Sequence, residues 1–144
     1  MPHHRGTFTV TTDQTCFDLD AIHACIASSY WAKDIPFETL ERAIRNSLAF
    51  GVFDGAEQVG FARVVTDRAT YGYLADVYIL EAYRGKGLAT WLMECICAHP
   101  DLQGLRRFAL ATRDAHGLYR KFGFTEIADP SKHMEVFKPE IYAI

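Results

Sequence analysis

One stretch of the sequence decides the fold: Val77-Tyr78-Ile79-Leu80-Glu81-Ala82-Tyr83-Arg84-Gly85-Lys86-Gly87-Leu88-Ala89. Its first residues predict a β-strand, and a glycine-rich turn then leads directly into a predicted helix. At such a helix N-terminus several backbone N–H groups point at one spot, and the helix dipole adds positive charge. Gly85 and Gly87 allow close approach of a diphosphate, and Arg84 and Lys86 can add charge at the rim. The stretch predicts a phosphate site, although an ordinary strand-to-helix turn would also carry two glycines.

The segments around this turn predict both strands and helices. Upstream, hydrophobic periodicity and turn residues predict a strand at 8–12, helices at about 18–29 and 36–48, and an antiparallel meander at 49–53, 58–65 and 73–80. Downstream they predict a helix at 87–98, a crossover to a strand at 106–111, a short helix at 115–122, and strands near 124–127 and 133–137. The predicted fold class is α/β (α+β), with a mixed, mostly antiparallel sheet and helices on both faces.

The composition fits a single domain over residues 1–144. Hydrophobic residues make up 49% of the chain, which is enough for a core that needs no disulfide or metal to stabilise it. The net charge is −3. A chain with this net negative charge has no overall positive potential to attract polyanions, so we expect neither a nucleic acid nor a membrane as partner. No apolar run has signal-peptide or membrane-spanning length, which predicts a cytoplasmic protein. The four cysteines form no C-x-x-C pair, and we expect reduced thiols and no metal site.

Two other phosphate-binding motifs fit the glycine-rich turn poorly. A nucleotide P-loop needs a Gly-Lys-Ser/Thr, which Gly85-Lys86-Gly87-Leu88 does not supply. A dinucleotide fingerprint needs a third glycine at the position of Thr90 and follows a parallel strand, whereas this turn follows an antiparallel meander.

The turn instead resembles the signature R/Q-x-x-G-x-G/A of the GCN5-related N-acetyltransferase (GNAT) family, matched by Arg84-x-x-Gly87-x-Ala89. The segment 115–124 is similar to the family's second motif, A-x-x-L-Y-x-x-x-G-F, and lies at the expected distance downstream. The resemblance spans about residues 8–137. It implies acetyl-coenzyme A as cofactor and a central strand splayed by a bulge.

The resemblance also implies which residues bind the cofactor. Backbone amides of Arg84, Gly85, Lys86, Gly87, Leu88 and Ala89 would hold the coenzyme A pyrophosphate, and the strand Val77, Tyr78 and Ile79 would pair with the pantetheine arm. Two positions depart from the family pattern. Glu81 stands where many members have proline. Thr112 stands where many have an asparagine that contacts the cofactor arm, and it would contact the cofactor or cap the following helix.

Acetyl transfer to an amine needs a neutral nucleophile and a proton for the departing thiolate. By resemblance Tyr119 lies close to the coenzyme sulfur and is the expected acid, with a packing role as the alternative. Asp76, on the strand that carries the acetyl group, is the expected base or water-orienting carboxylate, unless Arg63 simply pairs with it. His116 is expected to be a solvated or capping residue, and Tyr73 remains a reserve.

The acceptor would bind between the loop that follows the first helix and the meander. The candidate substrate-binding residues are Tyr30, Trp31, Phe37, Phe61, Arg63 and Tyr71. A cleft of aromatic and charged residues suits the amine of a small molecule. The alternatives are a protein acetyltransferase, acting on lysines or N-termini, and a catalytically silent coenzyme A-binding module. Whether the chain forms a homodimer stays open.

Overall fold

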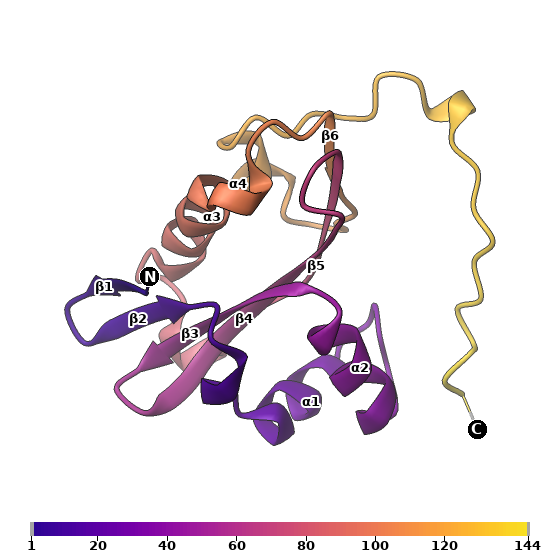
Figure 1. The fold of residues 1–144 in the computed structure, drawn as a ribbon. Helices are drawn as coiled ribbons and strands as arrows, with labels where there is room; N and C mark the ends of the chain where they lie inside the picture. The colour runs from indigo at the N-terminus through magenta and orange to yellow at the C-terminus, as the bar shows by residue number, and fades with distance from the viewer. Residues whose placement is uncertain (1, 144) are drawn as a thin grey trace.

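Six strands form one sheet in the order of the sequence, β1 to β6 (Figure 1). The computed structural model describes residues 2–143. The strands are β1 (His3–Arg5), β2 (Phe8–Thr11), β3 (Leu48–Asp54), β4 (Glu57–Thr66), β5 (Tyr71–Ile79) and β6 (Arg107–Leu110). Neighbours pair antiparallel from β1 to β5, and β5 pairs with β6 in parallel. The predicted mixed, mostly antiparallel sheet is confirmed, whereas β1 was not predicted.

Helices α1 (Leu19–Ala27) and α2 (Phe37–Arg45) cover one face of the sheet. The Asp18 carboxylate accepts a hydrogen bond from the backbone N–H of Ala21 at 3.0 Å and so caps the start of α1. Ile22 and Ile26, one turn apart on α1, pack with Leu40 and Ile44 of α2 over the sheet. These apolar stripes fix both helices beside the loop that joins them.

Helices α3 (Leu88–Ala98) and α4 (His116–Arg120) cover the opposite face. α3 buries Leu92, Met93 and Ile96 completely against β3, β4 and β5, because these side chains recur at three- and four-residue spacing. The crossover from β5 through α3 to β6 explains why β6 is the one strand that pairs in parallel. No helix among residues 2–143 is long and apolar enough to span a membrane.

The central strands splay apart, as expected. β6 pairs only with the first part of β5, residues 71–74, and β5 then continues to Ile79 without a partner on that edge. On its other edge β5 carries a bulge: between two paired positions β4 has one residue, Ala62, whereas β5 has two, Asp76 and Val77. Asp76 adopts a positive φ of 56°, which is uncommon for residues other than glycine. The bulge and the splay open the sheet at its centre.

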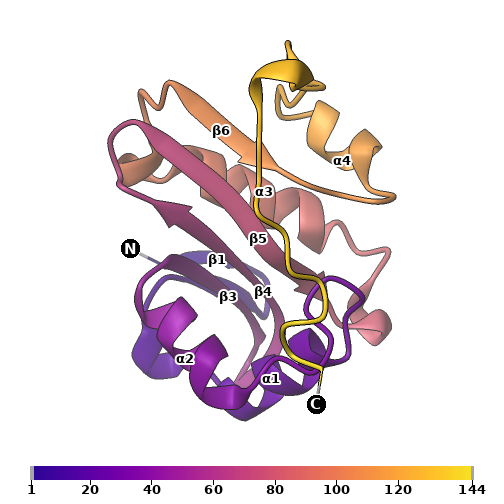
Figure 2. The same ribbon diagram turned by 90° about the vertical axis from the view of Figure 1, so that its right-hand side faces the viewer.

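The two strands predicted near 124–127 and 133–137 are wrong. Within the described residues, the chain after β6 forms α4 and a 3-10 turn (Pro130–Lys132) but no strand. Figure 2 shows the last residues passing in front of the sheet as an extended tail. Met134 and Val136 are 98% and 89% exposed. The alternating pattern is present in the sequence, but a strand also needs a neighbouring backbone to bond with, and within residues 2–143 the tail pairs with none.

Candidate active site

The glycine-rich turn opens α3 with free backbone amides. Gly85 and Gly87 both have φ of +78°, and a Cβ added to either would meet nothing within 4 Å. Gly87 is the N-cap of α3, no side chain caps the helix, and its first turn contains no acidic residue. The first helical backbone bond runs from Trp91 N to Gly87 O at 3.0 Å, so the preceding amides have no acceptor within the helix. The turn therefore suits an anion such as a diphosphate.

The basic residues of this turn differ in what they do. Arg84 donates from Nε to the carbonyl oxygen of Ile79 at 3.0 Å, so its side chain ties the turn to the end of β5. Lys86 is exposed. The charge at the rim of the turn is thus supplied most freely by Lys86, while Arg84 holds the turn's shape.

The strand edge next to the turn is open for pairing. Val77 and Ile79 lie on the part of β5 beyond its pairing with β6. The Tyr78 side chain points away from this edge, toward α1, where its ring lies 6.3 Å from that of Phe61. Burial, together with Cys25, raises the pKa of Tyr78. Only the backbone of Tyr78 can therefore contribute to the opening.

A cavity of about 560 Å³ lies where the sheet splays. Five parts of the chain line it: the bulged part of β5, the neighbouring part of β4, the segment from the end of β6 into α4, the loop between α1 and α2, and the tail. The lining includes Tyr30, Trp31, Arg63, Tyr73, Asp76, Val77, Thr112, Arg113, Tyr119 and Tyr142. It thus brings together the predicted acid, the predicted base and three predicted acceptor residues.

Asp76 is buried at the centre of a polar network in this cavity. One carboxylate oxygen accepts from Trp31 Nε1 at 2.7 Å and the other from Arg63 Nε at 2.5 Å. Arg63 also donates to Ser47 Oγ at 3.3 Å. The positive φ of Asp76 turns its side chain into this network. The ion pair with Arg63, raised above as an alternative role, is present, and it leaves further lone pairs on the carboxylate free for a ligand.

Aromatic residues continue this network over the cavity. The rings of Tyr30 and Trp31 meet edge to face with centroids 5.1 Å apart. The Arg113 guanidinium, from the segment between β6 and α4, lies 3.7 Å from the Tyr30 ring centroid, a cation–π contact. Side chains from the α1–α2 loop and from beyond β6 therefore meet across the opening.

Tyr119 lies on α4 at the inner wall of the cavity and is 8% exposed. Its hydroxyl has no hydrogen-bond partner among the described residues, although no buried polar atom there is left unsatisfied. The hydroxyl is therefore accessible from the cavity. Burial, and to a smaller extent Tyr30 and Asp114, raises the pKa of Tyr119, so the group stays protonated at neutral pH and can donate a proton.

The structure places several candidate residues elsewhere. Phe61 is fully buried beneath α1, and Phe37 packs against the His23 ring at 5.5 Å on the outer side of the helices. Tyr71 is exposed at the start of β5, away from the cavity. Thr112 lines the cavity, but its hydroxyl accepts from the backbone N–H of Ala115 at 3.1 Å and so caps the turn before α4.

Arg113 and Tyr142 line the cavity with polar side chains that were not candidates from the sequence. Arg113 stands two residues before the second motif, and this closeness to the motif is a usable signal. Tyr142 comes from the last residues of the tail and also packs against the core beneath α1 and α2. No local pattern indicates that contact, because it joins segments far apart in the sequence.

A splayed mixed sheet, an anion-binding turn at its opening and a polar cavity beside it define an acetyltransferase of the GNAT type. The sequence model of the Acetyltransferase (GNAT) family matches residues 17–124, more than half of the chain, and the chain belongs to this family.

Known relatives agree with this assignment. A Gibberella zeae protein with a provisional acetyltransferase name is 36% identical in an alignment that covers 81% of this chain and 78% of that protein. A GNAT-family crystal structure from Xanthomonas campestris is 48% identical, covers 100% of this chain and 99% of its own, and has a TM-score of 0.93. A Staphylococcus aureus structure of unknown function is 26% identical, with coverage of 91% and 98% and a TM-score of 0.70. None of these names a substrate.

Proposed function

We propose that this protein transfers an acetyl group from acetyl-coenzyme A to a primary amine of a small molecule, within a ternary complex. The observation that carries the proposal is the cavity at the splay, which Tyr119, Asp76 and the free edge of β5 at Val77 all line. In the reaction the amine nitrogen bonds to the acetyl carbonyl carbon, the carbon–sulfur bond breaks, and a proton passes to the sulfur.

The residues at the splay fit acetyl-coenzyme A, which supplies an activated thioester when bound. The amides at the start of α3 and Lys86 would hold its pyrophosphate, because an anion there gains both hydrogen bonds and the helix dipole. The free edge of β5 at Val77 and Ile79 would pair with its amide-containing arm, as with an added strand. Bound in this way, the cofactor would present its thioester to the cavity.

Asp76 would receive and orient the amine. A primary ammonium resembles lysine, whose pKa is about 10.4, so at neutral pH the site has to remove a proton before the amine can attack. The carboxylate is held in place by Trp31 and Arg63 and still has free lone pairs toward the cavity. It can accept a hydrogen bond from the amine or from a water that takes the proton.

Tyr119 would protonate the departing thiolate. The coenzyme thiol resembles cysteine, with a pKa of about 8.5, so a donor helps but is not indispensable. The hydroxyl has no competing partner among residues 2–143, and burial raises its pKa, so the group is protonated and able to donate at neutral pH. Direct transfer needs no covalent intermediate on the protein, and no cysteine lines this cavity.

The covered opening favours a small acceptor. The cavity volume lies within the range of about 300–1,000 Å³ that is usual for small-molecule sites. The Arg113 guanidinium over the Tyr30 ring joins two sides of its rim, whereas a protein acetyltransferase needs an open groove for a peptide. A cytoplasmic location, where acetyl-coenzyme A is made and used, would suit this activity.

The test is a panel of amines assayed for release of free thiol from acetyl-coenzyme A. The panel contains amino acids, aromatic amines, polyamines and amino sugars, with lysine peptides and N-terminal peptides as a separate arm. Acetylation of a small amine, identified by mass spectrometry, is the expected result. Acetylation of peptides alone would contradict the proposed acceptor. Failure of coenzyme A to bind at millimolar concentration in calorimetry would contradict the proposed reaction itself.

A further inference from the structure

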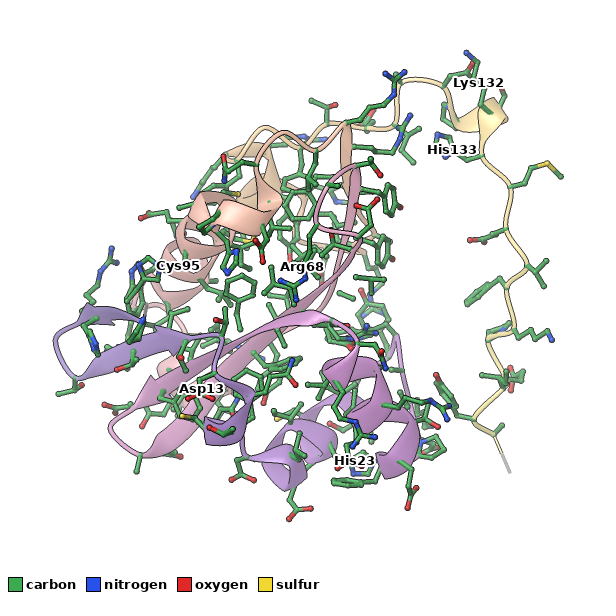
Figure 3. The ribbon with its side chains drawn as sticks, in the orientation of Figure 1. Asp13, His23, Arg68, Cys95, Lys132 and His133 are labelled. Atoms are coloured by element: carbon green, nitrogen blue, oxygen red, sulfur yellow. The ribbon has the colours of Figure 1, made fainter. Side chains whose placement is uncertain are left out.

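The tail leaves apolar side chains and backbone groups without partners. Met134, Val136, Phe137 and Ile141 are 98%, 89%, 71% and 62% exposed. Within the described part of the chain, residues 134–137 make no hydrogen bond through their backbone. Figure 3 shows the side chains of this tail standing clear of the domain below Lys132 and His133. An extended apolar segment of this kind indicates a binding surface.

An ordered turn directs the tail outward. The Asp129 carboxylate accepts from the backbone N–H of Ser131 at 3.2 Å, and Lys132 N donates to Asp129 O at 3.2 Å. Pro130 stands at the first position of this turn and restricts its backbone. At the other end Tyr142 packs against the core beneath α1 and α2. The segment 134–137 therefore runs between two points that its own chain holds.

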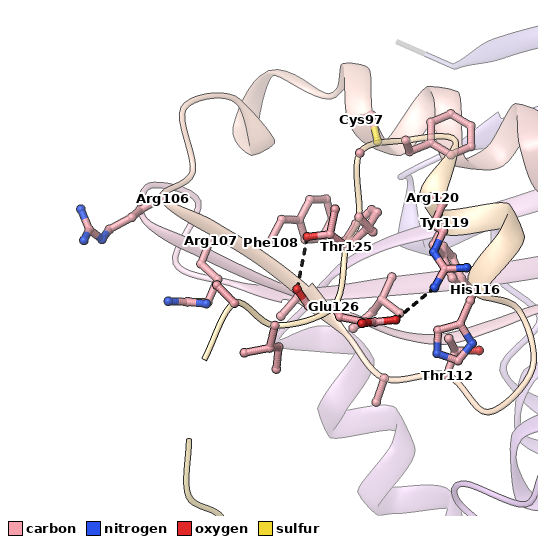
Figure 4. Close-up of a pocket in the computed structure, with 18 residues that line it drawn as sticks. Cys97, Arg106, Arg107, Phe108, Thr112, His116, Tyr119, Arg120, Thr125 and Glu126 are labelled. Atoms are coloured by element: carbon pink, nitrogen blue, oxygen red, sulfur yellow. Dashed lines mark hydrogen bonds and ion pairs between the residues drawn. The ribbon is translucent and has the colours of Figure 1, made fainter. Parts of the chain in front are cut away.

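The domain also has a vacant place for a strand. β6 pairs with β5 along one edge, and its other edge has no strand partner among residues 2–143. A cavity of about 610 Å³ lies along this edge, between β6 and residues 122–128 (Figure 4). Residues 124–127 form no strand although their sequence predicted one, which is expected if the strand between them and β6 comes from elsewhere.

The tail segment matches this place in length, pattern and charge. β6 has four residues, as has the segment 134–137. In an extended segment Met134 and Val136 point to one face and Glu135 and Phe137 to the other. In β6 Phe108 and Leu110 likewise share one face, and Arg107 at the edge of the cavity can pair with the acidic residue of the tail. The turn at residues 129–132 and the packing of Tyr142 hold the chain's own tail away from this edge (Figure 1), so the complementarity points to a second copy of the same chain as the occupant.

We propose that two copies exchange their tails, so that residues 134–137 of each copy add as a strand between β6 and residues 122–128 of the other. The exchange would give the free backbone N–H and C=O groups of β6 hydrogen-bond partners. The same symmetric interaction would bury the exposed side chains of the tail. It would also complete the wall behind Tyr119, which borders this cavity as well as the one at the splay.

The first test is the mass of the full chain in solution. Analytical ultracentrifugation should find a dimer for the unmodified protein. Val136→Asp places a charge in the exchanged strand and should raise the dimer dissociation constant by about 100-fold or more. Ile141→Asp is the matched control, because it changes an exposed apolar residue of the same tail outside the strand, and it should remain dimeric. A monomeric unmodified protein, a dimeric Val136→Asp variant or a monomeric Ile141→Asp variant would each overturn the proposal.

Hydrogen exchange separates tail exchange from other modes of association. The amides of residues 134–137 should be protected at least about tenfold relative to a free peptide, and the protection should fall when the protein is diluted into the monomer. A dimer whose tail amides exchange freely would mean that the copies meet elsewhere. A monomer with protected tail amides would mean that the tail folds onto its own chain. Either result would overturn the proposal.

Discussion

Replacing Tyr119 with phenylalanine removes a single hydroxyl from the wall of the active-site cavity. The ring is 8% exposed and packs edge to face with Phe124 at 6.0 Å, and phenylalanine preserves this packing. The hydroxyl has no protein partner among residues 2–143, so its removal leaves no buried group unsatisfied. The substitution therefore isolates the chemistry of the hydroxyl from the structure that holds it.

We expect the turnover number to fall about 100-fold in Tyr119→Phe. General acid catalysis typically contributes about 10² to 10⁴ in rate, and a thiolate leaves readily enough to place the effect at the lower end. Coenzyme A affinity should hardly change, because the proton is transferred only in the transition state. The free energy of unfolding should change by less than about 1 kcal/mol, which corresponds to a shift in Tm of only a few degrees.

The raised pKa of Tyr119 adds a dependence on pH. The donor is active while protonated, and burial moves the loss of its proton above the usual value of 10.0. In the unmodified protein any decline in the turnover number caused by this group should therefore lie at higher pH than the titration of a free tyrosine.

Steady-state kinetics with the best amine, calorimetry with coenzyme A and thermal melting together test this reasoning. Tyr73→Phe is the matched control: Tyr73 is a half-buried tyrosine of the same cavity whose pKa is also raised by burial. It should retain most of the turnover. Full activity in Tyr119→Phe would remove this residue from the mechanism and leave water as the donor. Equal losses in both variants would indicate a general effect on the cavity.

Two further predictions concern the turn and the ion pair of the cavity. Gly87→Val should abolish coenzyme A binding in calorimetry while the protein remains folded, since the added side chain occupies the open space in front of the amides. Gly104→Val is its control, because Gly104 also has a positive φ and open surroundings but lies away from the turn, and equal loss of binding in both would refute the assignment. Arg63→Met leaves a buried carboxylate unpaired and should lower the free energy of unfolding in urea by about 3–5 kcal/mol. Arg68→Met breaks a half-exposed ion pair and should cost less than about 1 kcal/mol, and similar costs for the two would show that burial does not matter here.

Local features of the sequence predicted the turn and the family correctly. Glycines at 85 and 87, followed by a periodic apolar run, predict the backbone conformation and the start of α3, because both depend on neighbouring residues alone. The same holds for the hairpin at Gly55 and for the apolar stripes of α1 and α2. The mixed sheet followed from the order of these elements and from the two motifs.

Contacts between distant segments needed the tertiary structure. The sequence offered Phe61 and Arg63 equally as acceptor residues, but packing beneath α1 buries the first and the bulge at Asp76 draws the second to the cavity. Arg113 meets Tyr30 only because the sheet splays between their elements.

The sequence by itself thus determined the glycine-rich turn before α3, the order of elements and the alternating pattern of the tail, because each depends on residues that are close together in the chain. The tertiary structure alone decided which side chains share the cavity and whether the tail is a strand. A strand requires two hydrogen-bonded backbones, and residues 134–137 have the pattern of a strand but no backbone partner among residues 2–143.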